Sequence, residues 1–590
     1  MARGFLPPGL LHVMPAHLVT EDIAAKALQH VANWPDWTYD LETTGLDPSR
    51  KDVAIGVAVE GFDGRGKWDN HSFYFPFRHR EGNIDRKHLP SLMQLLSTRR
   101  RVRTWNGGFD ARFSWNEGAR VDIPMQDCML DHHLLDENKG RGQYNLKGCA
   151  EQQFGPGATQ AERNLDFLLA SMLIPDKGGM WRLHSKNVAP YACGDVQLTR
   201  AMDEVQGPKL QHENLENVSS SVGEYARIVA GMEHRGITID RALIESEIPK
   251  VQKRIYDLFV QAMQMAGRKI ALNSADAVCA WLGIPSSADE ILQRMSNDPR
   301  VKIVQEFRKA RTAYNNYYKK FLAMAPDDVL RANMMLFIVI SGRMSVTDPP
   351  LQALPRDTSS YLVKKALIAR PGYTLVQADY QRAEMCLAAH YGKDTNMIAL
   401  LRSGVNMHRA VAEELGIDYD SAKRINFSVI YGIGPETLAD RINKPYAVAK
   451  MYLDRYHRKF PGFKRLYSAA HDYAEAHKYI TMCTGRRRHY NRGDRTPTHK
   501  ASSNLIQGSV AEIIRESQIN IDHELRTQDV HQLLQIHDAV IAEVPTEEVP
   551  RLVPRIKEIM EDHTRFAVPM RVDIKYGPNL ADTTEWKEAA

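Results

Sequence analysis

One interrupted apolar run constrains this chain more than any other stretch. Residues 533–544 read LLQIHDAVIAEV, and the only break in the run is the pair His537 and Asp538. Two apolar strands joined by two polar residues predict a buried β-hairpin with a two-residue turn. An ionised carboxylate buried without a partner costs far more than a domain tolerates. Asp538 therefore needs a positively charged partner, which the rest of the chain must help to identify.

A second acid has the same setting. Asp379 closes the strand-like segment YTLVQAD, and two strands that each end on an Asp can direct both carboxylates at one point. Like charges so close raise a pKa unless a cation lies between them. Carboxylate oxygens suit Mg²⁺ or Mn²⁺, and two such ions can stabilise the attacking and leaving oxygens of a phosphoryl transfer. A lone Asp in a turn is more often only a turn residue, so the two acids alone leave both interpretations open.

Between these acids lies a stripe that suits a nucleotide. Lys423, Phe427 and Tyr431 in AKRINFSVIYG are four residues apart, so a helix places them within one narrow face. A cation can meet phosphates, and aromatic rings can stack on a base or sugar. By itself, such a stripe is more often side-chain packing than a binding site.

Four acids and a phenol recur in the first third of the chain. Asp40 and Glu42 in YDLETTG would share one face of a strand. Asp110 follows a Gly pair, and Tyr191 and Asp195 in YACGDVQL would share one face of a helix. Four carboxylates can hold two divalent ions, and a Tyr hydroxyl can orient a water for attack on a phosphodiester. A solvated charge cluster is the alternative for any one pair.

Length and composition fix the broad class. The 590 residues are too many for one core and indicate two to four domains. No apolar stretch reaches 18 residues, so we expect no membrane span, and the six Cys show no CxxC pair, which favours reduced thiols. Basic runs at 99–103 and 486–489 predict either phosphate contacts or a solvated surface.

Four motifs in order carry a family resemblance. SGRMSVTDPPLQALPR, QADYQRAEM, AKRINFSVIYG and QIHDAV resemble the polymerase motifs of family A DNA polymerases, the group of bacterial DNA polymerase I and many phage replicases. The resemblance covers about residues 340–545 strongly and the preceding helical region more loosely. It implies a right-hand fold of palm, fingers and thumb, with DNA synthesis as the activity.

The resemblance also assigns roles by position. Asp379 and Asp538 resemble the metal-binding aspartates of the palm, with the Tyr380 carbonyl as a further ligand. Glu384 resembles the residue that blocks a ribose 2′-OH, and Lys423 resembles the fingers lysine that meets the triphosphate and donates a proton to pyrophosphate.

Further contacts follow from the same motifs. Phe427 and Tyr431 resemble the aromatic residues that face the nucleotide and template, and His408 resembles a phosphate contact of the fingers. The residues expected to contact primer–template DNA are Arg343, Gln352, Gln507 and His537.

The chain departs from the family pattern at three positions. Tyr419 stands where the family has an Arg four residues before the fingers lysine, and Ala539 stands where it has a Glu after the second aspartate. We therefore expect a palm site with two aspartates and one triphosphate contact fewer. Asn504 is one position from the usual Asn and receives no role.

The first domain resembles the DEDD-type 3′→5′ exonucleases, in the variant with Tyr in the third motif. The resemblance covers about residues 35–205 and matches all five positions, Asp40, Glu42, Asp110, Tyr191 and Asp195. It implies proofreading. Because the first motif begins at residue 40, we expect no separate 5′ nuclease domain, and this layout fits a phage-type enzyme.

Together these observations predict a multidomain chain of α/β and α+β classes, an RNase H-like exonuclease domain followed by a right-hand polymerase. The expected ranges are 1–205 for the exonuclease, 206–330 for a helical thumb, 331–405 with 500–590 for the palm, and 406–499 for the fingers. Expected cofactors are two Mg²⁺ per site, with Mn²⁺ as a substitute.

The expected partners and location follow from this function. Primer–template DNA and dNTPs are the substrates, and a helicase-primase and a single-strand binding protein are candidate replisome partners. We expect a cytoplasmic location, in the host cytoplasm if a phage encodes the chain. Two alternatives stay open: an exonuclease whose C-terminal half only binds duplex, and a non-catalytic DNA-binding scaffold.

Overall fold

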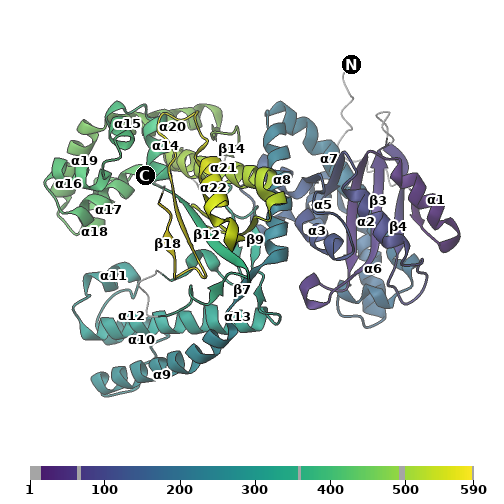
Figure 1. Ribbon diagram of the computed structural model, residues 1–590, viewed down its shortest axis with the longest axis horizontal. Helices are drawn as coiled ribbons and strands as arrows, with labels where there is room; N and C mark the ends of the chain where they lie inside the picture. The colour runs from purple at the N-terminus through teal and green to yellow at the C-terminus, as the bar shows by residue number, and fades with distance from the viewer. Residues whose placement is uncertain (1–14, 63–67, 356–360, 491–497, 588–590) are drawn as a thin grey trace.

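The computed structural model describes residues 15–62, 68–355, 361–490 and 498–587. Figure 1 shows an N-terminal α/β domain at one end of the molecule and the remaining elements at the other. The long helix α8 (Glu216–Arg235) lies between them.

The N-terminal domain is built on a six-stranded sheet of order β1-β4-β3-β2-β5-β6. Strands β2, β3 and β4 form an antiparallel meander, and β1, β5 and β6 each run parallel to their neighbour. The strands are β1 (Ala16–Leu18), β2 (Asp36–Thr43), β3 (Ala54–Phe62), β4 (Trp68–Pro76), β5 (Arg101–Thr104) and β6 (Met125–Asp127). The helices are α1 (Glu21–Ala32), α2 (His88–Leu96), α3 (Gly107–Asn116), α4 (Cys128–Leu135), α5 (Leu146–Phe154), α6 (Gln160–Ser171) and α7 (Ser185–His212).

A helical region follows, as the change of hydrophobic period near residue 205 predicts. Its helices are α8, α9 (Arg241–Ala266), α10 (Ala275–Leu282), α11 (Asp289–Arg294), α12 (Pro299–Thr312) and α13 (Lys319–Met324), with a π-helical turn at Ala313–Tyr318. A small sheet of β7 (Ile237–Ile239), β8 (Val329–Leu330) and β11 (Leu367–Ile368) joins this region to the rest. The boundary expected at residue 205 falls inside α7, which runs without a break to His212.

The C-terminal sheet is entirely antiparallel, in the order β15-β16-β12-β17-β18. Its strands are β12 (Tyr373–Tyr380), β15 (His531–Ile536), β16 (Ala539–Pro545), β17 (Val572–Gly577) and β18 (Thr584–Glu585). The helices α14 (Ala383–Tyr391), α21 (Ala501–Leu525) and α22 (Val549–Glu561) contribute to the same core as the sheet. A separate hairpin of β9 (Asn333–Met335) and β10 (Ser345–Thr347) precedes it.

A helical subdomain is inserted between β12 and α21. It comprises α15 (Thr395–Arg402), α16 (Met407–Leu415), α17 (Tyr419–Ile430), α18 (Pro435–Ile442), α19 (Tyr446–Lys459) and α20 (Pro461–His477), then the hairpin β13–β14 (Tyr479–Thr481, Arg487–His489). In Figure 1 the helices α16–α19 and α9–α12 extend to the same side, away from the N-terminal domain.

In each basic run at least one arginine is buried in an ion pair, whereas Arg100 and Arg101 of the first run are exposed, as the solvated-surface alternative expects. Arg488 is fully buried and pairs with Glu137 at 2.9 Å. Arg103 is buried and pairs with Asp203. The sequence alone does not show that acids far along the chain neutralise these arginines.

Two further expectations concern chemistry and location. All six cysteines lie in the described part of the chain, and each is a free thiol. Within the described ranges, the helices include none long and apolar enough to cross a membrane.

Candidate active sites

The two palm acids meet at one end of the C-terminal sheet. Asp379 pairs directly with Ala539 across strands β12 and β16, and Asp538 immediately precedes that partner. His537 and Asp538 form the two-residue turn between β15 and β16, with His537 in the left-handed region at φ 53°. The predicted hairpin is confirmed, and pairing of β12 with β16 explains why acids some 160 residues apart converge.

Desolvation and nearby negative charges make these carboxylates costly to ionise. Burial, together with the charges of Asp538 and Asp573, raises the pKa of Asp379 to about 6, against the opposing effect of Lys575. Burial also raises the pKa of Asp538, although the nearby Arg343 opposes it. A bound cation would relieve this repulsion.

Sequence reasoning missed a third acid beside the pair. Asp573 lies directly opposite Asp379 on β17, so both side chains project from the same face of the sheet. Gln381 donates a hydrogen bond to its carboxylate. The available signal was an Asp in the strand-like segment RVDIKYG, but only the register shows which residue it faces.

Glu384 of α14 accepts hydrogen bonds from two distant segments of the chain. Arg343 donates a hydrogen bond to one carboxylate oxygen at 2.8 Å, and the Tyr431 hydroxyl donates to the other at 2.6 Å.

The side chain of Tyr380 points into the protein interior, where its hydroxyl is hydrogen-bonded to Ser517, Met560 and His563. Only the main chain of Tyr380 is therefore free for the role expected of it.

The helix α17 presents the expected stripe to solvent. Lys423 is exposed, Phe427 is 46% exposed and Tyr419 is 40% exposed, whereas Tyr431 caps the end of the helix. His408 of α16 completes the patch, with its ring 5.7 Å from Tyr419 and 5.8 Å from Phe427. Burial and the charge of Lys423 lower the pKa of His408.

The expected DNA contacts lie at three places. Arg343 and Gln507 both contact the Glu384–Tyr431 pair. Arg343 donates a hydrogen bond to Glu384, and burial raises the pKa of Tyr431 against the lowering effect of a hydrogen bond from Gln507 to its hydroxyl. Gln352 uses its amide locally, donating to the Met344 carbonyl at 3.1 Å. His537 lies in the turn beside Asp538.

The N-terminal acids form a second cluster. Asp40 and Glu42 share one face of β2, and Asp195 of α7 brings a carboxylate oxygen within 4.8 Å of theirs. Asp110 lies alongside and accepts the Leu41 N–H at 3.0 Å. Burial raises the pKa values of Asp40, Glu42 and Asp110, and repulsion from Asp40 adds to the effect on the other two.

One atom shows that this cluster fits a cation. Glu42 is only 5% exposed, and within the described residues its Oε1 has no hydrogen-bond partner. A buried carboxylate oxygen without a donor is costly. Oxygen ligands of this kind suit Mg²⁺ or Mn²⁺, so the residues fit the expected metal.

Two lysines that the motif analysis missed lie at this cluster. Lys147 of α5 forms an ion pair with Asp195 and lies 4.5 Å from the centre of the Tyr191 ring. Lys177 lies 5.0 Å from the same ring and pairs with Glu162 of α6. Neither lysine follows from the acid spacing, because both come from segments outside β2, α3 and α7.

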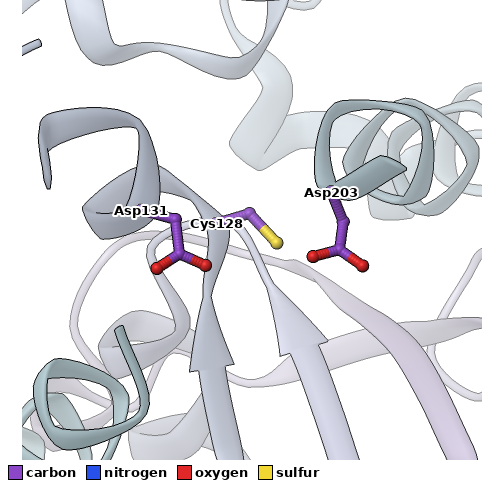
Figure 2. A group of neighbouring side chains, drawn as sticks. All are labelled: Cys128, Asp131 and Asp203. Carbon is purple, nitrogen blue, oxygen red and sulfur yellow. The ribbon is translucent and has the colours of Figure 1, made fainter. Parts of the chain in front are cut away.

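A third group of metal-ligating side chains is explained by hydrogen bonds. Cys128, Asp131 and Asp203 lie together where α4 approaches α7 (Figure 2). The amide of Gln126 donates to Asp131 at 2.9 Å and to Asp203 at 3.0 Å. Arg103 also pairs with Asp203, and burial raises the pKa of the Cys128 thiol well above its ordinary value. This group is a satisfied polar network.

A comparison with protein-family models decides the relationship. The model described as DNA polymerase family A matches residues 242–582, more than half of the chain. The chain belongs to DNA polymerase family A. The resemblance seen in the four motifs is therefore confirmed.

The curated relatives that match this family A member include bacterial DNA polymerase I enzymes. The chain is 24% identical to that of Pseudomonas aeruginosa over 93% of its length and 63% of the relative. It is 27% identical to that of Chloroflexus aurantiacus over 96% of its length and 63% of the relative. The chain thus spans less than two thirds of these relatives' own length.

A solved structure supports the fold. The chain described as "POL domain of Pol1 from M. smegmatis complex with DNA primer-template and dNTP" matches with a TM-score of 0.78 at 20% identity, over 96% of this chain and 99% of that one. The predicted multidomain mixed α/β fold is confirmed. The exonuclease assignment and the phage-type origin stay predictions.

Proposed function

We propose that this family A member is a DNA-dependent DNA polymerase that adds dNTPs to a primer 3′ end and proofreads with a 3′→5′ exonuclease, in replication or repair. The observation that carries the proposal is the convergence of Asp379 and Asp538 at one end of the palm sheet. Mg²⁺, with Mn²⁺ as a substitute, would supply charge neutralisation and activate the primer hydroxyl at both carboxylates.

The palm and fingers residues have complementary parts in this reaction. Asp379, Asp538 and the Tyr380 carbonyl would hold two divalent ions. Lys423 would bind the triphosphate from its exposed position on α17 and protonate the pyrophosphate. Phosphoryl transfer depends mainly on such positioning and electrostatic stabilisation.

Neighbouring side chains would bind the incoming nucleotide and select a deoxyribose sugar. Glu384, fixed by Arg343 and Tyr431, would pack against the sugar edge and reject a 2′-hydroxyl. Phe427 would stack against the nucleotide, and His408 would contact a phosphate. The residues proposed for the primer–template are Arg343, Gln352, Gln507 and His537.

The N-terminal cluster would remove mispaired 3′ ends. Asp40, Glu42, Asp110 and Asp195 would hold two divalent ions, and the Tyr191 hydroxyl would orient the attacking water. Clustered acids repel phosphates in the absence of cations, so this arrangement is poorly suited to a site that only binds DNA. That argument disfavours a non-catalytic scaffold.

The domain division belongs to the proposal. Residues 1–205 would form the exonuclease, 206–330 the thumb, 331–405 and 500–590 the palm, and 406–499 the fingers. The course of α7 to His212 supports moving the first boundary to the turn before α8. Primer–template DNA and dNTPs would be the substrates, with a helicase-primase and a single-strand binding protein as further partners.

A second candidate function is an exonuclease whose C-terminal half only binds duplex. The observations that favour it are Tyr419 and Ala539, which replace a cation and an acid of the family pattern. The convergence of Asp379 and Asp538 favours the polymerase, because duplex binding requires no pair of converging acids.

Primer extension distinguishes the two. The purified chain is incubated with dNTPs and a primed template in Mg²⁺ and in EDTA, using matched and mismatched 3′ ends. We expect extension of the matched primer and trimming before extension of the mismatched one, both only in Mg²⁺. Asp379→Asn should bind primer–template normally and lose extension; extension at the wild-type rate by this variant would refute the proposal.

A further inference from the structure

A lysine occupies the cation position of the N-terminal acid cluster. The Lys147 ammonium pairs with Asp195 Oδ1 and lies over the face of the Tyr191 ring. Its side chain is 17% exposed, so water screens the pair only partly. Burial lowers the pKa of Lys147 to about 8, although the charges of Glu162, Asp40 and Glu42 oppose this change.

The base of this lysine is fixed, but its end is not. Lys147 lies in the first turn of α5, where the Asn145 side chain accepts the Gly148 N–H at 2.7 Å. Cys149 and Ala150 anchor the same helix in the domain interior. A lysine carries a compact charge on a flexible four-carbon stem, so the ammonium can change position while the backbone stays in place.

The pair with Asp195 competes with a metal. Carboxylate oxygens of Asp40, Glu42 and Asp195 lie within 4.8 Å of one another and could share one ion. An ammonium on Asp195 Oδ1 would repel a divalent ion at that position. Binding of the ion must therefore displace the ammonium from Asp195.

The displaced ammonium has a second place close by. The face of the Tyr191 ring already lies beneath it, and Lys177 lies 5.0 Å from the same ring. Lys177 is held by Glu162 and by Asp166 at 3.8 Å, so its charge is partly neutralised. Once released from Asp195, Lys147 would remain next to the phenol expected to face the phosphodiester and would be free to contact a phosphate.

We propose that Lys147 is a displaceable cation: it neutralises Asp195 when no divalent ion is bound, and on metal binding it releases Asp195 and contacts the phosphate of the 3′-terminal nucleotide. The inference rests on the proposed exonuclease function and deepens it. It adds a phosphate-binding residue to the four acids and the tyrosine, and it gives the metal-free site a defined state.

The test measures metal affinity and cleavage in the same variant. Lys147→Gln and the control Lys186→Gln, an exposed lysine of α7, are made in an Asp379→Asn, Asp538→Asn background, so that metal binding reports on the N-terminal cluster. Mn²⁺ affinity is measured by titration calorimetry. Cleavage of a single-stranded 3′ end is measured in Mg²⁺.

The proposal predicts opposite changes. Without its competitor, the cluster of Lys147→Gln should bind Mn²⁺ about five-fold more tightly, equivalent to about 1 kcal/mol. Without its phosphate contact, the same variant should cleave at least about ten-fold more slowly, whereas Lys186→Gln should match the background in both assays. Weaker or unchanged Mn²⁺ binding in Lys147→Gln would overturn the inference, since a merely structural lysine predicts a joint loss.

A second variant covers failure of the first to fold. Lys147→Met keeps most of the stem without the charge. Its Tm should lie below that of the background in both conditions, and the difference should be larger in EDTA than in saturating Mg²⁺. Equal differences in the two conditions would contradict displacement. If the wild-type chain binds Mn²⁺ but does not cleave, the exonuclease proposal fails together with the phosphate role, whereas the Mn²⁺ shift still reports on displacement.

Discussion

A partly buried histidine of the hairpin β13–β14, His489, contacts acids of the N-terminal domain and makes a pH-dependent prediction. His489 bonds Glu137 through Nδ1 at 3.0 Å and Glu213 through Nε2 at 2.9 Å. Both ring nitrogens face carboxylates, so the imidazolium is the form that satisfies the site. Burial lowers the pKa of His489, but the hydrogen bonds and charges of Glu137 and Glu213 outweigh it and raise the pKa to about 9.

The surroundings of His489 contain charges from every packed element. Glu137 follows α4, Glu213 caps α7, and the hairpin itself adds Arg487 and Arg488. The ring of Tyr479 lies 6.3 Å away on the paired strand. Each arginine already pairs with one of the two carboxylates, so loss of the His489 charge leaves the acids partly compensated.

The magnitude follows from the two pKa values. The folded value of about 9 exceeds the ordinary value of 6.5, and this gap corresponds to about 3 kcal/mol, an upper figure for the contribution of the protonated ring. Because the folded pKa is the higher one, the contribution is complete below pH 6.5 and is lost as the pH rises through 9. The folded state holds its proton where the unfolded state has released it, so stability must fall with pH in this window.

The assay is urea unfolding of the wild type and of His489→Gln at pH 6, 7.5 and 9.5. The free energy of unfolding should differ most at pH 6 and least at pH 9.5, with a change of about 2–3 kcal/mol between these limits. The effects of other histidines cancel in this difference. His477→Gln, an exposed histidine of α20, is the control and should show no such change. Parallel pH profiles for the wild type and His489→Gln would refute the reasoning.

Three further predictions address the candidate sites. Asp40→Ala with Glu42→Ala should abolish trimming of single-stranded 3′ ends, by at least about 100-fold, and leave extension of matched primers intact; unchanged trimming by the purified double variant would count against the cluster. Glu384→Ala should raise ribonucleotide incorporation about 10-fold or more relative to dNTP incorporation, because the side chain held by Arg343 and Tyr431 no longer fills the sugar edge; an unchanged ratio in competition assays would argue against this role. Lys423→Ala should raise the KM for dNTP and lower kcat by about ten-fold each, since one side chain is expected to bind the triphosphate and protonate pyrophosphate; steady-state extension kinetics with wild-type values would remove Lys423 from the site.

Local patterns in the sequence predicted much of what the structure shows. The two-residue turn at His537 and Asp538 followed from an apolar run with one polar break, and the exposed face of α17 followed from the spacing of Lys423 and Phe427. These features depend on residues close in the chain, where the helical and strand periods fix the geometry. The family assignment was equally accessible, because it rests on ordered motifs.

Features that depend on long-range pairing were not accessible. Arg488 lies in a run that resembles a solvated surface, and only the fold brings Glu137, some 350 residues earlier, against it. Asp573 faces Asp379 only because β17 pairs with β12 in one particular register, and a shift of one residue would turn its side chain to the other face. A sequence states which groups can pair, but chain topology decides which of them do.

The two acid clusters reveal how differently one chain can manage the same electrostatic problem. In the palm, Asp379 and Asp538 have no ion pair with a lysine or arginine among the described residues, and burial raises the pKa of both. In the N-terminal domain, Lys147 already pairs with Asp195. Without divalent ions, protonation can relieve the repulsion in both clusters, because the pKa values of Asp379, Asp40 and Glu42 are all raised, and the N-terminal cluster has its own ammonium in addition. Because the proposed binding of a divalent ion displaces Lys147 from Asp195, this ammonium is expected to weaken metal binding at the N-terminal cluster, and among the described residues no lysine or arginine forms an ion pair with the palm acids that could do the same.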